Sequence, residues 1–150
     1  MEITKLPEKI LTQKVQEVEI KKVKSGEFDS LFLDMKKAMK ENNGIGLAAN
    51  QIGKDLAIFI IDENIAKENN VPDVYINPEI TDYSKDKDEM EEGCLSIPEY
   101  YVPIIRSKKI KIKAVNERGE KIKFKARGLL ARILQHETDH LNGLTIKQRS

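Results

Sequence analysis

The sequence predicts an α+β fold in which antiparallel strands pack around a buried helix near the C-terminus. Three features predict it: a short apolar run at residues 56–62, alternating apolar and charged residues over 109–126, and helical spacing of apolar residues from Gly128 onward. Because no repeat and no convincing linker interrupts residues 1–150, we expect a single domain. A chain of this length can bury about two-thirds of its unfolded surface.

The first half of the chain predicts one helix and two strands. Residues 26–43 space their apolar side chains as a helix does, and Gly44 is expected to end that helix. The run LAIFIID at 56–62 is continuous and apolar, which is typical of a buried strand. The segment VYINPEI at 74–80 is extended but interrupted by Pro78.

The second half predicts a hairpin followed by the buried helix. Before them, SKDKDEMEE at 84–92 is the most loop-like stretch of the chain. Apolar and charged residues alternate on both sides of NERGE at 116–120, which indicates a hairpin with one solvent-exposed face. The apolar spacing then becomes that of a mostly buried helix, from Gly128 to a stop at Gly143.

Composition argues against polyanionic partners and against a membrane span. The chain has 26 Lys and Arg against 25 Asp and Glu, so its net charge of +1 predicts no nucleic-acid partner and no attraction to anionic lipid. No apolar run approaches the roughly 18 residues of a membrane span, and the start, MEITKLPEKI, lacks the apolar segment of a secretory signal. The single cysteine, Cys94, excludes an internal disulfide. These features predict a cytoplasmic location.

The segment HETDH, residues 136–140, contains both histidines of the chain. On a helix, residues at i and i+4 lie on one face with Cβ atoms about 5–6 Å apart, so His136 and His140 can bind one metal ion. Glu137 between them can act on a bound water. The alternative is that the histidines face solvent or fill the edge of the core. Since buried polar groups need partners and this helix is predicted to be buried, a metal ion explains the cluster better.

The third ligand of such a site has to come from upstream. After His140 the chain reads LNGLTIKQRS, with no His, Glu, Asp or Cys, so the ligand patterns of ordinary zinc peptidases are absent. The remaining residue with soft-ligand character is Cys94, whose alternative role is that of a small buried apolar residue. Gly93 before it permits a close backbone approach. Two histidines and one cysteine leave one position for water, as in a catalytic site.

A glycine-rich segment, NNGIGLAANQIG at residues 42–53, is nearly free of bulky side chains. It matches neither phosphate-binding loop pattern. One interpretation is a helix C-cap followed by a tight connection. The other is a backbone along which an extended ligand passes, with Gln51 directing an amide donor toward a polarised oxygen.

Three of these stretches, in this order, resemble the motifs of the peptide deformylases: GIGLAANQ (44–51), EGCLS (92–96) and QHETDH (135–140). The resemblance extends over nearly the whole chain. It implies that Cys94, His136 and His140 bind one divalent metal ion, Fe²⁺ in the cell, which Zn²⁺ or Ni²⁺ can replace. It also implies a substrate, the N-terminal formylmethionine of nascent peptides, from which formate is released.

The resemblance assigns further roles by position. Glu137 is the expected general base and later the acid, and the Gln51 side chain and the Leu95 backbone N–H are the expected donors to the oxyanion. The peptide is expected to lie as an added strand along Gly46. Its methionine side chain is expected in an apolar pocket near three further residues, Ile45, Met90 and Leu129.

Two departures from the family pattern qualify these expectations. Several bacterial relatives have an arginine where this chain has Tyr101, so the rim of the peptide groove is expected to differ. The chain continues for only ten residues after His140, as in shortened members that include phage-encoded ones, which leaves ribosome contact open and predicts a bacterial cell or a phage-infected host. Two alternative functions are a non-catalytic relative that keeps the metal for stability and a general metallopeptidase.

Overall fold

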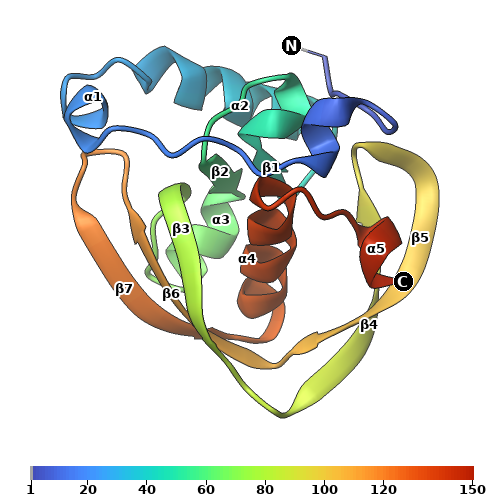
Figure 1. Ribbon diagram of the computed structural model, residues 1–150. Helices are drawn as coiled ribbons and strands as arrows, with labels where there is room; N and C mark the ends of the chain where they lie inside the picture. Colours follow the sequence, from blue (N-terminus) through green and yellow to red (C-terminus); the bar gives the residue numbers. More distant parts are fainter. Residues whose placement is uncertain (1) are drawn as a thin grey trace.

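The fold is built on a five-stranded antiparallel sheet and a separate two-stranded ribbon. We describe residues 2–150 in a computed structural model of the chain (Figure 1). The strand order in the main sheet is β1-β2-β3-β6-β7, so that β1 and β7 form its two edges. These strands are β1 (Gly46–Ala48), β2 (Ile58–Ile61), β3 (Val74–Tyr83), β6 (Lys109–Val115) and β7 (Lys121–Arg127).

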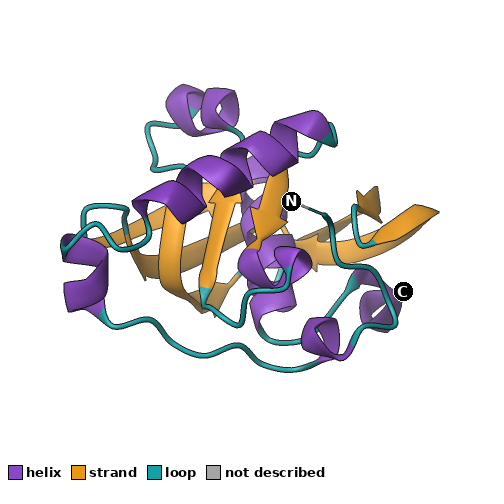
Figure 2. Cartoon of the chain, turned by 90° about the horizontal axis from the view of Figure 1, so that it is seen from above, coloured by secondary structure: helices purple, strands orange, loops and turns teal. Residues whose placement is uncertain are grey.

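Helices cover both faces of this sheet. Besides the 3₁₀ turns η1 (Lys9–Thr12) and η2 (Ala49–Ile52), the helices are α1 (Ile20–Lys24), α2 (Asp29–Glu41), α3 (Glu63–Glu68), α4 (Gly128–Leu141) and α5 (Ile146–Arg149). Figure 2 shows the long helix α2 lying across the strands. Across residues 2–150, none of these helices has the length and apolar character needed to cross a bilayer.

Strand β2 separates the two hydrophobic clusters because successive side chains of a strand point to opposite faces. Phe59 and Ile61 pack in the cluster that contains the buried face of α4. Ile58 and Ile60 pack in the cluster that contains the buried face of α2. The predicted architecture, antiparallel strands around a buried late helix, is confirmed, and α4 lies against the sheet on the face opposite to α2.

The prediction of a loop at 84–92 is confirmed for residues 84–86 and wrong for residues 87–92. The latter belong to strand β4 (Lys87–Cys94), which pairs with β5 (Ile97–Ser107) as the two-stranded ribbon. Residues 87–91 are all exposed, so the side chains of this strand meet solvent on both faces, while Ile104, Arg106 and Ser107 of the paired β5 segment are buried. The high charge density therefore marks an exposed strand, and Glu92 is the first buried residue of β4.

One helix end and one strand differ in detail from the predictions. Helix α2 ends at Glu41, and Asn43 rather than Gly44 takes the left-handed conformation, with φ of 57°. Strand β3 continues past Pro78 through a register shift at Asn77, whose side chain hydrogen-bonds both the N–H and the C=O of Val18 at 2.8 Å. The hairpin over 109–126 is confirmed as β6 and β7.

Tyr75 places a hydroxyl inside the hydrophobic cluster under α4. Its ring stacks on Phe59 with a centroid distance of 4.9 Å, and the side chain is fully buried. Within residues 2–150 the hydroxyl has no hydrogen-bond partner, and burial together with the charge of Asp73 raises its pKa. An unpaired buried hydroxyl lowers stability relative to an apolar ring of the same shape.

Tyr75→Phe is therefore expected to stabilise the fold by about 1 kcal/mol, because it removes an unpaired polar atom and keeps the stacked ring. Chemical denaturation of the two proteins side by side measures the difference in free energy of unfolding. A loss of stability would show that the hydroxyl has a partner in solution.

Candidate active site

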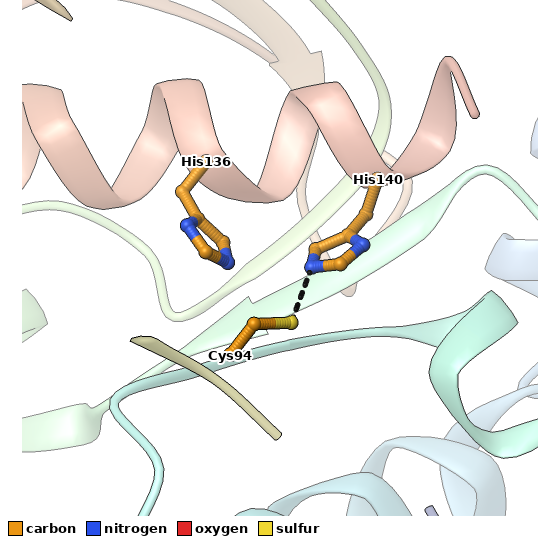
Figure 3. A group of neighbouring side chains, drawn as sticks. All are labelled: Cys94, His136 and His140. Atoms are coloured by element: carbon orange, nitrogen blue, oxygen red, sulfur yellow. Dashed lines mark hydrogen bonds between the residues drawn. The ribbon is translucent and has the colours of Figure 1, made fainter. Parts of the chain in front are cut away.

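Three ligand-type side chains from two distant parts of the chain meet beside α4. Cys94 ends strand β4, and His136 and His140 lie one turn apart on α4, with ring centroids 5.0 Å apart (Figure 3). Their nearest ligand atoms all lie within 4.8 Å of one another, and Cys94 Sγ is 3.2 Å from His140 Nε2. The structure thus brings together the three residues predicted to bind a metal ion.

Gly93 lets Cys94 reach this position. In the β4–β5 ribbon Gly93 is opposite Tyr101, and a Cβ atom on Gly93 would lie 2.4 Å from the Tyr101 ring. The pairing register then shifts between Gly93 and Cys94, which ends the strand at the site. A side chain at position 93 would force the tyrosine away and move the backbone that carries Cys94.

Glu92 orients the first histidine. The Nδ1 of His136 donates to Glu92 Oε1 at 2.8 Å, which leaves Nε2 of the same ring facing the gap between Cys94 and His140 (Figure 3). Two arginines hold the carboxylate: Arg106 at 2.6 and 2.9 Å, and Arg132 at 2.6 Å. Burial alone would raise the pKa of Glu92, but the hydrogen bonds from His136 and Arg106 outweigh it and lower the pKa to about 2.

The same network continues to the last helix. Arg106 also donates to Asp139 at 2.9 Å, and Asp139 accepts two bonds from Arg149 of α5 at 2.8 and 3.0 Å. Sequence reasoning missed the roles of these residues and of Glu92 and Arg132. A signal was present: Arg132 lies one helical turn before His136 on a face predicted to be buried, where a charge needs a partner.

The two histidines differ in their affinity for protons. Burial lowers the pKa of His140 well below its usual value, and the charge of His136 acts in the same direction. Burial also acts to lower the pKa of His136, but the neighbouring Cys94 and Glu92 raise it to about 10. A metal ligand must offer an unprotonated nitrogen, so His140 is ready to bind, while a metal ion has to displace a proton from His136.

These donors fit a transition metal. One thiol and two imidazoles form a soft to borderline donor set, and three protein ligands are the number found in catalytic rather than structural sites. A histidine ligand normally donates its second nitrogen to a carboxylate, and His136 does so to Glu92.

Glu137 lies next to His136 in the lining of a cavity, and its exposed fraction is 4%. Its Oε1 atom has no partner among the described residues, and burial raises its pKa to about 7. Gly46 of β1 packs directly against it, since a Cβ atom there would be 2.5 Å from Glu137 Oε2. A carboxyl group with this pKa can take up and release a proton near neutral pH.

The glycine-rich segment forms β1 followed by η2, so it contains extended backbone as well as a tight turn. Gln51 is buried, and its amide Nε2 lies 3.5 Å from Cys94 Sγ and 3.1 Å from Ser96 Oγ. Its Oε1 accepts from the Ala48 N–H at 3.0 Å, which fixes the direction of the amide. Leu95, next to Cys94, is partly buried against the cluster under α2.

A large cavity opens from these residues to solvent. The four predicted substrate-binding residues line it: Ile45, Gly46, Met90 and Leu129. The three with side chains are 45–49% exposed, as residues at an open apolar surface are. Tyr101, also in the lining, is 68% exposed at the rim.

Comparisons with known proteins agree with this geometry. The family model of the polypeptide deformylases matches residues 1–150. The chain belongs to the peptide deformylase family. A peptide deformylase of Prochlorococcus marinus (strain MIT 9312) is 44% identical over 149 residues, which cover 99% of this chain and 73% of the relative. Deformylases are metalloenzymes that remove the formyl group from nascent peptides, and this chain is a hydrolase of that class in protein biosynthesis.

Solved deformylase structures have the same fold. A class I type b peptide deformylase from Acinetobacter baumannii, with a bound compound named K3U, is 34% identical with a TM-score of 0.93, covering 100% of this chain and 98% of that one. A structure of the Acinetobacter baumannii deformylase with Met-Ala-Ser bound is 31% identical with a TM-score of 0.90, covering 100% and 98%.

The role of Glu92 can be tested by Glu92→Gln. Loss of the carboxylate charge leaves each of the two buried arginines with one acid, Arg106 with Asp139 and Arg132 with Asp88, and weakens the bond that orients His136. Metal affinity is therefore expected to fall about 10–100-fold. Chelator competition measures this affinity, with Glu89→Gln, an exposed residue of the same strand, as the control. Equal affinities in both variants would show that Glu92 does not support the ligand.

Proposed function

We propose that Cys94, His136 and His140 hold one divalent metal ion and that Glu137 performs the proton transfers of deformylation. The observation that carries the proposal is the meeting of one thiol and two imidazoles beside a cavity that Glu137 also lines, where its Oε1 atom has no partner among the described residues. When bound, the ion supplies a Lewis acid that polarises the formyl group and lowers the pKa of water.

The proton transfers assign two roles to Glu137. First, its carboxylate takes a proton from the attacking water, whose oxygen forms a bond to the formyl carbon. Then it delivers this proton to the amine nitrogen as the carbon–nitrogen bond breaks, which releases formate and a free N-terminus. Its pKa of about 7 suits both steps at neutral pH.

We propose that Gln51 and Leu95 stabilise the negative charge that develops on the formyl oxygen. The Gln51 amide is held in one orientation by its bond to Ala48, and its Nε2 points to the segment that carries Cys94. We assign the second donor to the Leu95 backbone N–H. Donors of this kind each contribute about 3 kcal/mol to transition-state stabilisation.

The peptide is proposed to bind as an additional strand beside β1. This strand forms one edge of the main sheet, so one side of its backbone is free to pair with a ligand. Gly46 begins β1 in contact with Glu137, and the methionine side chain would enter between Ile45, Met90 and Leu129. The Met-Ala-Ser complex of the Acinetobacter baumannii relative supports a peptide of this class as ligand.

We further propose Fe²⁺ as the metal in the cell, with Zn²⁺ or Ni²⁺ able to replace it, because the donor set is that of a soft to borderline transition metal. We also propose action in the cytoplasm of a bacterial cell or of a phage-infected host, which is supported by the bacterial relatives and by the similar structure of a probable peptide deformylase from Synechococcus phage S-SSM7.

Glu137→Gln is expected to keep the metal and the fold but to lose formate release by at least about two orders of magnitude, because the amide cannot carry the proton. Formate release from formyl-Met-Ala-Ser, metal content and thermal unfolding are measured on one preparation. Glu68→Gln, on an exposed face of α3, is the control.

Near-normal activity of Glu137→Gln would refute its role as base. Activity of the unaltered, metal-loaded chain on formylated peptides but not on acetylated or internal peptide bonds separates the deformylase from a general metallopeptidase. A metal-loaded chain that releases no formate would be the non-catalytic relative.

The metal ligands give a second expectation. Cys94→Ala should be purified nearly free of metal, since two imidazoles alone make a weak site. If iron is the native metal, air or peroxide should inactivate the iron-loaded chain through oxidation of the iron and its thiolate ligand, and the nickel-loaded chain should resist. Full metal content in Cys94→Ala, or equal loss of activity with both metals, would contradict the ligand set or the iron assignment.

A further inference from the structure

One face of the β6–β7 hairpin consists of cations. The outward-facing residues of both strands are exposed lysines and one arginine, and we call them the cationic face: Lys109, Lys111, Lys113, Lys121, Lys123, Lys125 and Arg127. The residues between them point inward and are buried or partly buried, so no apolar side chain interrupts the cationic face. The net charge of +1 hides this concentration, and two acids of β3 border it: Glu79 is paired in register with Lys113, and Asp82 with Lys111.

The pairing register places these charges directly opposite one another. Lys109 faces Arg127, Lys111 faces Lys125 and Lys113 faces Lys123. Like charges in opposed positions destabilise a strand pair. Within residues 2–150, a single member of the cationic face forms a salt bridge: Lys113 with Glu79 of β3, at 3.0 Å.

Neither solubility nor protection of the sheet edge explains this arrangement. Alternating lysine and glutamate would solvate the same surface and would replace repulsion by attraction. Lysines on an edge strand prevent pairing with other chains, and β7 is an edge strand. Strand β6, however, lies between β3 and β7, so its three lysines do not protect an edge. Acids of β3 pair with two of them, Lys111 and Lys113, but the β7 residues opposite all three are cations.

The cationic face also contains a hollow. At the end of the hairpin that leads into α4, four cations converge on one depression: Lys109, Lys111, Lys125 and Arg127. Ser84 and a single acid, Asp82, complete its charged and hydroxyl lining. A concave surface with four cations and one acid favours an anion that can enter it.

We infer that the cationic face binds the phosphate backbone of RNA. Cations on one face of a strand repeat about every 6.6–6.8 Å, so two adjacent rows present a regular ladder of point charges to a polyphosphate. Lysine contacts to phosphate position a nucleic acid without reading its sequence. The substrates of a deformylase are nascent peptides, and these are attached to the ribosome, a particle rich in RNA.

An anionic bilayer fits the same surface less well. Stable membrane binding requires apolar side chains that insert, and the cationic face has none exposed. A flat lipid surface also cannot enter the hollow. The location allows RNA and a peptide to be bound at the same time. The cationic face lies on the side of the sheet that α2 covers, opposite to the side that packs against α4. RNA bound there would leave the peptide cavity open.

The test uses the whole chain and an RNA duplex of about 16 base pairs of arbitrary sequence, with binding followed by fluorescence anisotropy. We expect a dissociation constant on the order of 10⁻⁴–10⁻⁶ M at physiological salt, rising steeply with salt concentration. Lys111→Gln/Lys125→Gln should weaken binding at least about tenfold and reduce the logarithmic salt slope by about two, one for each phosphate contact.

Lys22→Gln/Lys67→Gln is the matched control, since it removes the same charge from exposed sites outside the cationic face. Both double variants should release formate from free formyl-Met-Ala-Ser at the unaltered rate, which keeps this test separate from that of the proposed function. Lys111 and Lys125 are an opposed pair, so their removal also relieves repulsion. Lys111→Gln/Lys125→Gln should therefore not unfold at a lower temperature than the unaltered chain. Lys109→Gln/Arg127→Gln provides a second test of the same hollow.

Three results would overturn the inference. The first is no RNA binding at low salt. The second is that Lys111→Gln/Lys125→Gln and the control Lys22→Gln/Lys67→Gln weaken RNA binding equally. The third is that the chain does not bind RNA but binds phosphatidylserine vesicles through Lys111 and Lys125. This result would assign the cationic face to a membrane.

Discussion

The Glu92 carboxylate is the group on which the geometry of the site depends. It accepts hydrogen bonds from Arg106 of β5, and from Arg132 and His136 of α4, so one buried anion joins the ribbon to the helix. Burying a charge costs several kcal/mol unless it is paired and fully hydrogen-bonded, and such networks contribute little net stability. Their effect here is orientation: the ring of His136 has one position in which its Nδ1 bond is made.

This constraint explains why a two-stranded ribbon, which has no hydrophobic core of its own, can deliver a metal ligand. Residues 87–91 of β4 are exposed, whereas the β5 residues paired with them include the buried Ile104, Arg106 and Ser107. The following part of β4 carries Glu92 and Cys94 to α4. Arg106 then connects the ribbon to Asp139, and Asp139 to Arg149 of α5. The site is thus held by ionic contacts on the ribbon side and by hydrophobic packing on the sheet side.

Local patterns predicted the elements that have one buried and one exposed face, because period-two and helical spacing record that asymmetry directly. The hairpin over 109–126 and the helix from Gly128 are such elements. The ribbon was missed because residues 87–91 meet solvent on both faces and have no such asymmetry.

For the site, the three motifs indicated which residues are expected to carry the chemistry, and the structure brings Cys94, His136 and His140 together beside a cavity. The contacts that orient them could not be read from spacing. Glu92 lies 14 residues from Arg106 and 40 from Arg132, and pairing over such separations leaves no periodic trace. Arg132 on a buried helical face was the one local sign of a missing partner.

The contact between Gly46 and Glu137 has a consequence for how widely the enzyme acts. With no side chain at position 46, the backbone of β1 and the carboxyl group touch directly. In the proposed binding mode a peptide is located by main-chain hydrogen bonds to β1, and these are the same for every amino-acid sequence. The distance from the formyl group to Glu137 then does not vary with the residues that follow methionine. Such an arrangement suits a processing enzyme that has to accept most of the proteins a cell makes.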